Sequence, residues 1–261
     1  ANNLVNFTKD GFGVLMQAIK CGSEVIVTNV LTLLQAPGQE KALADNLGNF
    51  TKDDFGVLMQ AILFGSEEVF SKVLALLQAP GHEKALANNL ANFTKDNFGV
   101  LLSAIKSGSE VIVTNVLTLL QAPGHEKALA ANLATFNKEG FGVLMQAISS
   151  GSVKIVIKVL ALLQAPGHEQ ALANNLANFT TDDFGVLQSA IKSGSEEIFS
   201  KVLILLQAQG NEKFLANNLA HFTKGGFGVL QIAIKSGSEV IFTNVLTLLQ
   251  APGQEKALAD N

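Results

Sequence analysis

Hydrophobic positions along the chain follow a helical period within short segments, and the whole pattern then recurs every 43 residues. In the first copy, Val14, Leu15, Ala18 and Ile19 occupy the i, i+1, i+4 and i+5 positions of an amphipathic helix. This stripe predicts a helix over Asp10–Cys21, with one apolar face turned toward a core.

A second helix is predicted directly after the first. Gly22 is suited to end the first helix, and Ser23 is a suitable N-cap for the next one. Glu24 adds a negative charge to the first turn, where the helix dipole favours it. The apolar stripe is wide enough to be largely buried, and its members are Ile26, Val27, Val30, Leu31, Leu33 and Leu34.

A shorter third helix is predicted after the Ala-Pro-Gly break at residues 36–38. It covers Glu40–Asn49, with Leu43 and Leu47 on its inner face. No segment is predicted as a strand, because β-branched runs such as residues 25–27 fall inside the helical period. Each copy is therefore expected to hold two full helices and a shorter third one, joined by short connections as antiparallel neighbours.

The long period predicts the fold class. The phrase Phe-Gly-Val-Leu occurs six times at intervals of 43 residues, and a fixed period of this length is typical of a solenoid. We predict an all-α protein, an α-solenoid of six tandem 43-residue repeats that form a single domain over residues 1–261. The expected repeats are residues 6–48, 49–91, 92–134, 135–177, 178–220 and 221–261.

The chain begins and ends at the same point of the repeat, without the polar capping repeats that solenoids usually carry. Two expectations follow. The chain is an excised piece of a longer array, or its end faces are covered by other subunits.

Composition narrows the classes of partner. The net charge is −4, and every positive residue is a lysine. Arginine is the preferred side chain for phosphates and guanine edges, so nucleic acid is disfavoured as a main partner. No apolar run is long enough to cross a membrane. Cys21 is the single cysteine, which excludes an intrachain disulfide and weakly indicates a reducing, intracellular compartment; the localisation is otherwise undetermined.

The sequence offers no catalytic constellation. The recurrent glycines form neither a GxGxxG nor a Walker motif, which leaves turns and helix packing as their role. His82, His125 and His168 share one position of the repeat, where Gln or Asn stands in other copies, so we interpret them as polar helix-start residues. We expect no enzyme activity, no cofactor and no metal site.

Residues 15–27, "LMQAIKCGSEVIV", followed by Val30-Leu31, resemble the helical core of an ankyrin repeat. The chain departs from that family in its Phe-Gly-Val-Leu start, its 43-residue period and a third helix in place of the β-hairpin finger. The repeat length and layout are also similar to armadillo and HEAT repeats. The phrase "LLQAPG" gives a fainter likeness to transcription-activator-like effector repeats. The ankyrin-like resemblance implies that the first helix lines the concave face.

Two polar residues recur in every copy, and we interpret both as structural. Their side chains would form hydrogen bonds between adjacent repeats or donate hydrogen bonds to loop carbonyl groups. Contact with a ligand is the open alternative. Likewise, the pair Phe7 and Phe12 and its copies are expected to form core ladders. The recurrent polar residues are Asn46, Asn89, Asn132, Asn175, Asn218 and Asn261, and Gln35, Gln78, Gln121, Gln164, Gln207 and Gln250.

Variable positions beside the first-helix stripe are the candidate partner-binding residues. Neutral drift on a solvated face is the alternative explanation for their variation. Leu63 and Phe64 are expected to expose an apolar patch. The candidates are Met16, Gln17, Lys20, Met59, Gln60, Leu63, Phe64, Lys106, Lys192 and Lys235.

Three functions remain open from the sequence. The first is a non-enzymatic scaffold that binds another protein along its concave face. The alternative is a structural assembly protein whose uncapped ends stack head-to-tail with copies of itself into a ring or filament. A sequence-tolerant DNA binder of the activator-like repeat type ranks lower, because the chain has no basic stripe.

Overall fold

The computed structural model describes residues 3–261, which form six consecutive three-helix repeats. Within this range there is no β-strand, only an isolated bridge between Phe50 and Gly56. Repeats 1 to 3 contain α1 (Val14–Lys20), α2 (Glu24–Leu34), α3 (Glu40–Gly48), α4 (Val57–Phe64), α5 (Glu67–Leu77), α6 (Glu83–Ala91), α7 (Val100–Ser107), α8 (Glu110–Leu120) and α9 (Glu126–Ala134), after a short 3-10 helix, η1 (Asn3–Val5). Repeats 4 to 6 contain α10 (Val143–Ser149), α11 (Val153–Leu163), α12 (Glu169–Ala177), α13 (Val186–Lys192), α14 (Glu196–Gln207), α15 (Glu212–Ala220), α16 (Val229–Ser236), α17 (Glu239–Leu249) and α18 (Glu255–Asp260).

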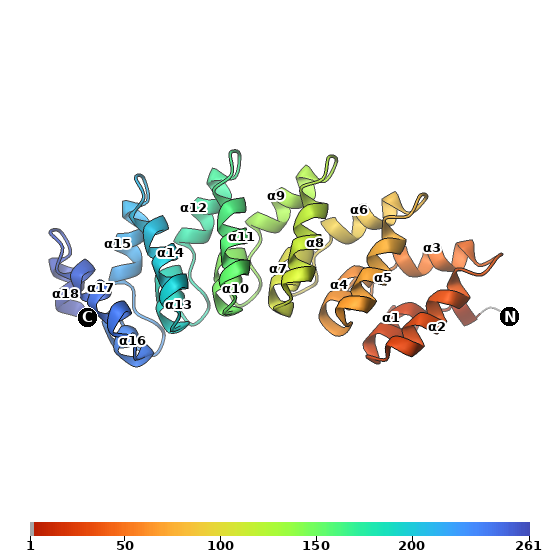
Figure 1. Cartoon of the computed structure of the whole chain (residues 1–261), viewed down its shortest axis with the longest axis horizontal. Coiled ribbons are helices and arrows are strands. Elements are labelled where there is room, and N and C mark those ends of the chain that lie inside the picture. The colour runs from red at the N-terminus through yellow and green to blue at the C-terminus, as the bar shows by residue number, and fades with distance from the viewer. Residues whose placement is uncertain (1–2) are drawn as a thin grey trace. The chain divides into compact units, whose positions relative to one another are not determined.

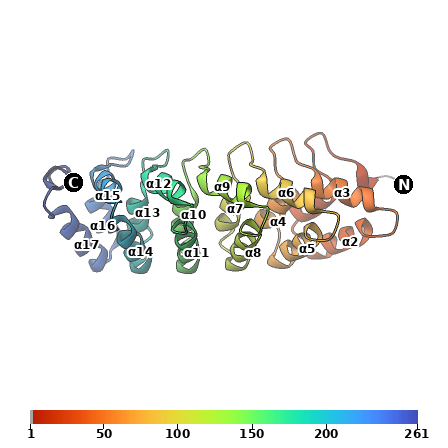
Figure 2. The ribbon, with the colours of Figure 1, turned by 90° about the horizontal axis from the view of Figure 1, so that it is seen from above.

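The chain divides into two compact units, an N-terminal unit that ends at Thr135 and a C-terminal unit that begins at Phe136. In the N-terminal unit, first helices contact first helices (α1, α4, α7), second helices contact second helices (α2, α5, α8), and third helices contact third helices (α3, α6, α9). The C-terminal unit repeats this order with α10 to α18 (Figure 1). Within each unit, Figure 2 shows the second helices on one side and the third helices on the other. Each unit is thus an all-α stack of three repeats, and the single-domain organisation stays a prediction.

The predicted second and third helices are confirmed almost to the residue, whereas the first helix is shorter than predicted. It begins at Val14 rather than Asp10. Before it, the hydroxyl of Thr8 accepts a hydrogen bond from the Phe12 amide at 3.0 Å, and Gly11 has φ of +84°. This turn satisfies the backbone locally and takes the chain out of helical geometry. With 7 residues, α1 is the shortest helix of its repeat, not the third helix as expected.

Aliphatic residues of the first and second helices fill the core of each unit. The side chains of Leu15, Ile19, Val27 and Leu34 are fully buried. The expected phenylalanine ladders are only half-buried, because the rings of Phe7, Phe12 and their copies lie in the turns that precede the first helices. The core prediction is therefore confirmed for the helical stripes and overstated for these rings.

The recurrent asparagines form the predicted inter-repeat hydrogen bonds. In repeat 2, the Nδ2 of Asn89 donates to the carbonyl oxygen of Leu47 in repeat 1 at 3.0 Å, and its Oδ1 accepts from the Leu58 amide at 3.1 Å. A third bond from Nδ2 reaches Ala85 within α6 at 2.9 Å. One buried amide thus joins the third helix of one repeat to the first and third helices of the next. The recurrent glutamines differ, because they are exposed at or near the ends of the second helices, and within residues 3–261 none of their side chains forms a hydrogen bond.

The glycine of each Phe-Gly-Val-Leu phrase leaves room for this asparagine. A Cβ atom on Gly99 would lie 2.5 Å from Oδ1 of Asn132 and 2.5 Å from the ring of Phe93. Ordinary carbon contacts are well over 3 Å, so any larger residue would displace the asparagine or the ring. The recurrent glycine therefore has a packing role at the start of each first helix.

No helix in residues 3–261 is both long and apolar enough to cross a membrane.

Candidate functional site

The first-helix face is the candidate binding surface, and we define it as the exposed positions of the first helices together with the turns that precede them. Three of the predicted binding residues do not belong to it. Met16 and Met59 are each 1% exposed, and Gln60 is 2% exposed. At the position of Met16 in repeat 5, Gln188 is also buried and donates to the carbonyl oxygen of His221 at 2.7 Å. This position faces the connection to the following repeat rather than solvent.

The other predicted residues lie at the surface to different degrees. Gln17 is exposed, Phe64 is 48% exposed, and Leu63 is half-buried. The exposed lysines share one further property, because each amine lies over the face of a phenylalanine ring in its own repeat, at distances suited to a cation–π contact. The pairs are Lys20 with Phe12 (4.8 Å), Lys106 with Phe98 (4.6 Å), Lys192 with Phe184 (4.4 Å) and Lys235 with Phe227 (3.5 Å).

Successive turns on this face are linked by lysines and acids. The Lys52 amide donates to the carbonyl oxygen of Asp10 at 2.9 Å, and its amine pairs with the Asp10 carboxylate at 3.2 Å. Lys95 and Asp53 repeat this arrangement one step later, with an ion pair of 3.3 Å. Both pairs are exposed, so each contributes little to stability, but each occupies a carboxylate that would otherwise be open to a ligand.

A cavity on the first-helix face lies between α10 and α13 in the C-terminal unit, with a volume of about 690 Å3. Its lining residues include the aromatic Phe141 and Phe184 and the charged Glu139, Asp182 and Lys192. Ser149 also lines it, at the position that lysine occupies in four of the six repeats. The cavity thus combines aromatic surface with two carboxylates and one amine.

Sequence comparison of the repeats includes Ser149 among the variable positions but does not reveal the cavity. The missed signal is a second lysine replacement in the same junction. Thr181 stands where Lys52 and Lys95 stand in earlier repeats, and its amide donates to the carbonyl oxygen of Glu139 at 2.9 Å. The backbone hydrogen bond between the two turns is thus retained, but the lysine amine that pairs with the acid in earlier repeats is absent. Ser149 in repeat 4 and Thr181 in repeat 5 therefore each replace a lysine of the repeat consensus, and both residues line this cavity.

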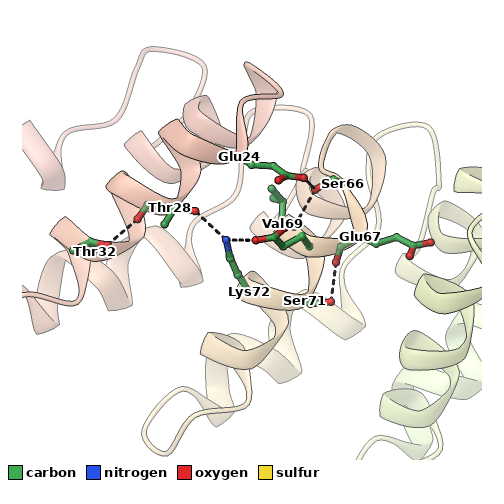
Figure 3. Close-up of polar contacts among 9 residues, drawn as sticks. Glu24, Thr28, Thr32, Ser66, Glu67, Val69, Ser71 and Lys72 are labelled. Atoms are coloured by element: carbon green, nitrogen blue, oxygen red, sulfur yellow. Dashed lines mark hydrogen bonds and ion pairs between the residues drawn. The ribbon is translucent and has the colours of Figure 1, made fainter.

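The polar contacts between second helices also change at this junction. In the N-terminal unit, the Ser66 hydroxyl donates to the Glu24 carboxylate of the preceding repeat, and the Lys72 amine donates to the Thr28 hydroxyl at 3.0 Å (Figure 3). In the C-terminal unit, Ser238 donates to Glu196 at 2.7 Å. Val153 replaces the glutamate in repeat 4, so Ser195 has no carboxylate at this position to bond.

The histidines and glutamates that start the third helices stabilise the connecting turns. The Nδ1–H of His82 donates to the carbonyl oxygen of Leu76 at 2.7 Å, and Asn211 makes the same contact to Leu205 in repeat 5. The carboxylate of Glu83 accepts from the Gly81 amide at 3.0 Å. Hydrogen bonds from the amides of Gly81 and Glu83 hold the pKa of this carboxyl below its ordinary value of 4.5. These are structural contacts, as the helix-start interpretation predicts.

In the described part of the chain, no three His, Cys, Asp or Glu side chains converge as a metal-binding group.

Comparison with protein-family models finds no family that matches the chain, and comparison with curated proteins finds no match either. The class that the fold defines is therefore a tandem-repeat protein with 43-residue, three-helix repeats.

Proposed function

We propose that this chain is a non-enzymatic scaffold that binds a segment of another protein at its first-helix face. The ankyrin-like spacing of residues 15–31 supports the choice of face, because the resemblance implies that first helices line the binding surface. The repeated core residues hold these helices at a regular spacing, and the side chains that differ between repeats lie beside them.

The observation that carries the proposal is the cavity between α10 and α13. It opens on the first-helix face, it is hollow enough to receive a side chain, and it combines apolar and charged groups as binding pockets do. Two of its lining residues, Ser149 and Thr181, also depart from the repeat consensus. A binding surface needs such local differences, whereas stacking requires only the repeated features.

A display library of random peptides, selected on the immobilised chain, tests the proposal. We expect enriched peptides that bind the wild-type chain and lose binding to a variant with Gln146→Glu and Ser189→Glu, which changes a half-buried position of α10 and a residue of α13 that lines the cavity. The matched control carries Gln78→Glu and Gln121→Glu, two exposed changes at the ends of second helices. Enrichment that neither pair affects would exclude this face, and a selection without enriched binders would exclude the scaffold proposal.

A second candidate function, assembly with other copies of the chain, is favoured by three exposed apolar residues whose equivalents in other repeats are buried. Ile26 and Leu33 of α2 are 47% and 55% exposed, whereas the equivalent Val69 and Leu76 of α5 are 3% and 9% exposed. In repeat 6, Ile234 of α16 is 61% exposed. These surfaces have the same chemistry as the contacts between repeats, so a second copy stacked head-to-tail would suit both.

Light scattering over a hundredfold range of concentration tests the assembly candidate. A mass that rises with concentration in the wild-type chain, and stays at 27.5 kDa in a Leu33→Glu variant, would support it. Thr32→Glu is the matched control, because it adds the same charge at an exposed neighbouring position. A constant mass of 27.5 kDa for the wild-type chain would exclude assembly through these faces.

A further inference from the structure

The cavity between α10 and α13 lies where the repeat pattern would put two lysine side chains and this chain has neither. Four repeats place a lysine amine over a phenylalanine ring, but repeat 4 has Ser149 beside Phe141. Two junctions of the N-terminal unit pair a turn lysine with the acid of the preceding repeat, but repeat 5 has Thr181 beside Glu139. Phe141 and Glu139, the partners of these lysines in the repeat pattern, are both present, but the two lysine amines are absent.

The geometry points to a binding site for one alkylammonium or guanidinium group here, supplied by a lysine or arginine side chain of the protein partner. This inference deepens the proposed scaffold function and rests on it for the source of the cation. The cation would occupy the space over Phe141 and approach the Glu139 carboxylate, as the amines of the chain's own lysines do in other repeats.

Charge on the cavity wall supports a cationic ligand. The charged residues that line the cavity are Glu139, Asp182 and Lys192, which together carry one net negative charge. The Lys192 amine already lies 4.4 Å from the centre of the Phe184 ring. Among residues 3–261, the Glu139 carboxylate forms no hydrogen bond or ion pair, so it is open to a cation.

The two turns that carry these groups are fixed before any ligand binds. The Oδ1 of Asn137 accepts from the Glu139 amide at 3.0 Å and from the Phe141 amide at 2.8 Å. The Thr180 hydroxyl accepts from the Phe184 amide at 3.1 Å, and the Thr181 amide donates to the backbone carbonyl oxygen of Glu139 at 2.9 Å. A preorganised aromatic face and carboxylate lose little conformational entropy on binding, which favours even a small cation.

The test uses n-butylammonium chloride as the probe, because it has the chain and charge of a lysine side chain. Binding is followed by the amide NMR signals of Phe141 and Thr181 in the full chain at constant ionic strength. We expect saturable shifts at these two residues and an affinity about three- to tenfold higher than that of n-butanol, which is the difference a cation–π contact supplies. Equal affinities for the two probes would overturn the inference, since the site would then be merely apolar.

Two variants test where the cation binds. Ser149→Lys restores the residue that four other repeats carry, so it should fold normally and abolish butylammonium binding by filling the site with its own amine. Leu63→Lys is the matched control, because it makes the same consensus change in repeat 2 of the N-terminal unit and should leave binding unaltered. Binding that survives Ser149→Lys would overturn the inference.

Glu139→Gln supplies an independent check that retains the shape of the cavity. We expect butylammonium affinity to fall about two- to fivefold, the usual range for an accessible ion pair. An unchanged affinity would overturn the role of the carboxylate. The peptide selection separates this inference from the scaffold proposal: enriched peptides without lysine or arginine would refute the cation site alone, whereas butylammonium binding without any enriched peptide would refute the scaffold alone.

Discussion

At the residue scale, the buried asparagine is the most informative position of the repeat. Asn89 satisfies a carbonyl of the preceding repeat, an amide at the start of α4 and a carbonyl of its own helix with one side chain. A buried polar group without a partner costs free energy, so an asparagine with this many bonds holds three backbone segments at fixed distances.

Asn89→Ala should therefore lower the free energy of unfolding by about 2–4 kcal/mol, because it leaves the Leu58 amide and the Leu47 carbonyl unpaired in the interior. Urea unfolding followed by circular dichroism gives the change, and faster hydrogen exchange at the Leu58 amide locates it. Asn88→Ala is the control, since Asn88 is exposed and its loss should cost less than about 0.5 kcal/mol. Equal effects of the two substitutions would contradict the structural role of Asn89.

The glutamates that begin the third helices predict a pH dependence. Backbone amides lower the pKa of Glu83 and Glu126 below 4.5 in the folded chain, so folding favours their ionised form. The stability that they contribute is complete above pH 4.5 and is lost as pH falls through the lowered pKa values.

Thermal midpoints of the wild-type chain and of a Glu83→Gln, Glu126→Gln double variant, measured from pH 7 to pH 3, test this. We expect the variant to be less stable at pH 7 and to lose less stability than the wild type as the pH falls. Lys127→Gln, a change at an exposed neighbouring position, is the control and should retain the wild-type slope below pH 4.5. Parallel curves for the wild type and the double variant would contradict the proposed contribution.

At the element scale, the sequence predicts the second and third helices well because their signals are local. The Ser23 hydroxyl caps α2 by accepting a hydrogen bond from the Ile26 amide, and the sequence Ala-Pro-Gly at residues 36–38 separates α2 from α3. The predicted start of α1 is wrong because the helical stripe does not reveal the turn at Gly11. In this turn the Thr8 hydroxyl accepts a hydrogen bond from the Phe12 amide, and Thr51 lies close to Gly11.

The candidate site was only partly predictable for a related reason. Exposure of Gln17, Lys20 and Phe64 follows from the stripe of the first helix. Burial of Met16 and Met59 depends on contacts with other segments of the chain, which a single helix pattern cannot give. Ser149 and Thr181 both line the cavity, but they are 32 positions apart in the sequence and come to the same cavity only through the stacking of repeats 4 and 5.

The junction between repeats 4 and 5 also predicts an element-scale effect on stability. Val153 stands at the first position of α11, where five other repeats have glutamate. Val153→Glu should place a carboxylate within reach of the Ser195 hydroxyl, as Glu196 is for Ser238, and should favour the helix dipole. We expect a stabilisation of about 0.3–1 kcal/mol.

A double-mutant cycle with Ser195→Ala isolates the new bond from the effect of the charge on the helix. We expect a coupling free energy of about 0.5 kcal/mol between the two positions. A stabilisation by Val153→Glu that is unchanged in the Ser195→Ala background would assign the whole effect to the helix dipole and contradict the predicted bond.

At the scale of the whole molecule, each unit is stabilised by contacts between like helices of adjacent repeats. The stability of such a stack is the sum of the stabilities of single repeats and of the contacts between adjacent repeats. The number of repeats can therefore change, but the alignment of each repeat on its neighbour cannot. A deletion of 43 residues should therefore be tolerated where a shorter one is not.

Removal of residues 50–92 tests this in the N-terminal unit, because it joins Asn49 to Phe93 and keeps every inter-repeat contact in register. Asn132 would meet the Leu47 carbonyl in place of Leu90, and Ser109 would meet Glu24 in place of Glu67. We expect unchanged helicity per residue by circular dichroism and a lower free energy of unfolding, since one set of stacking contacts is lost. Removal of residues 50–77 is the control: it deletes α4 and α5 but leaves α6 without its first-helix partner, and should lower the helicity per residue. Equal helicity after both deletions would contradict a fixed register between repeats.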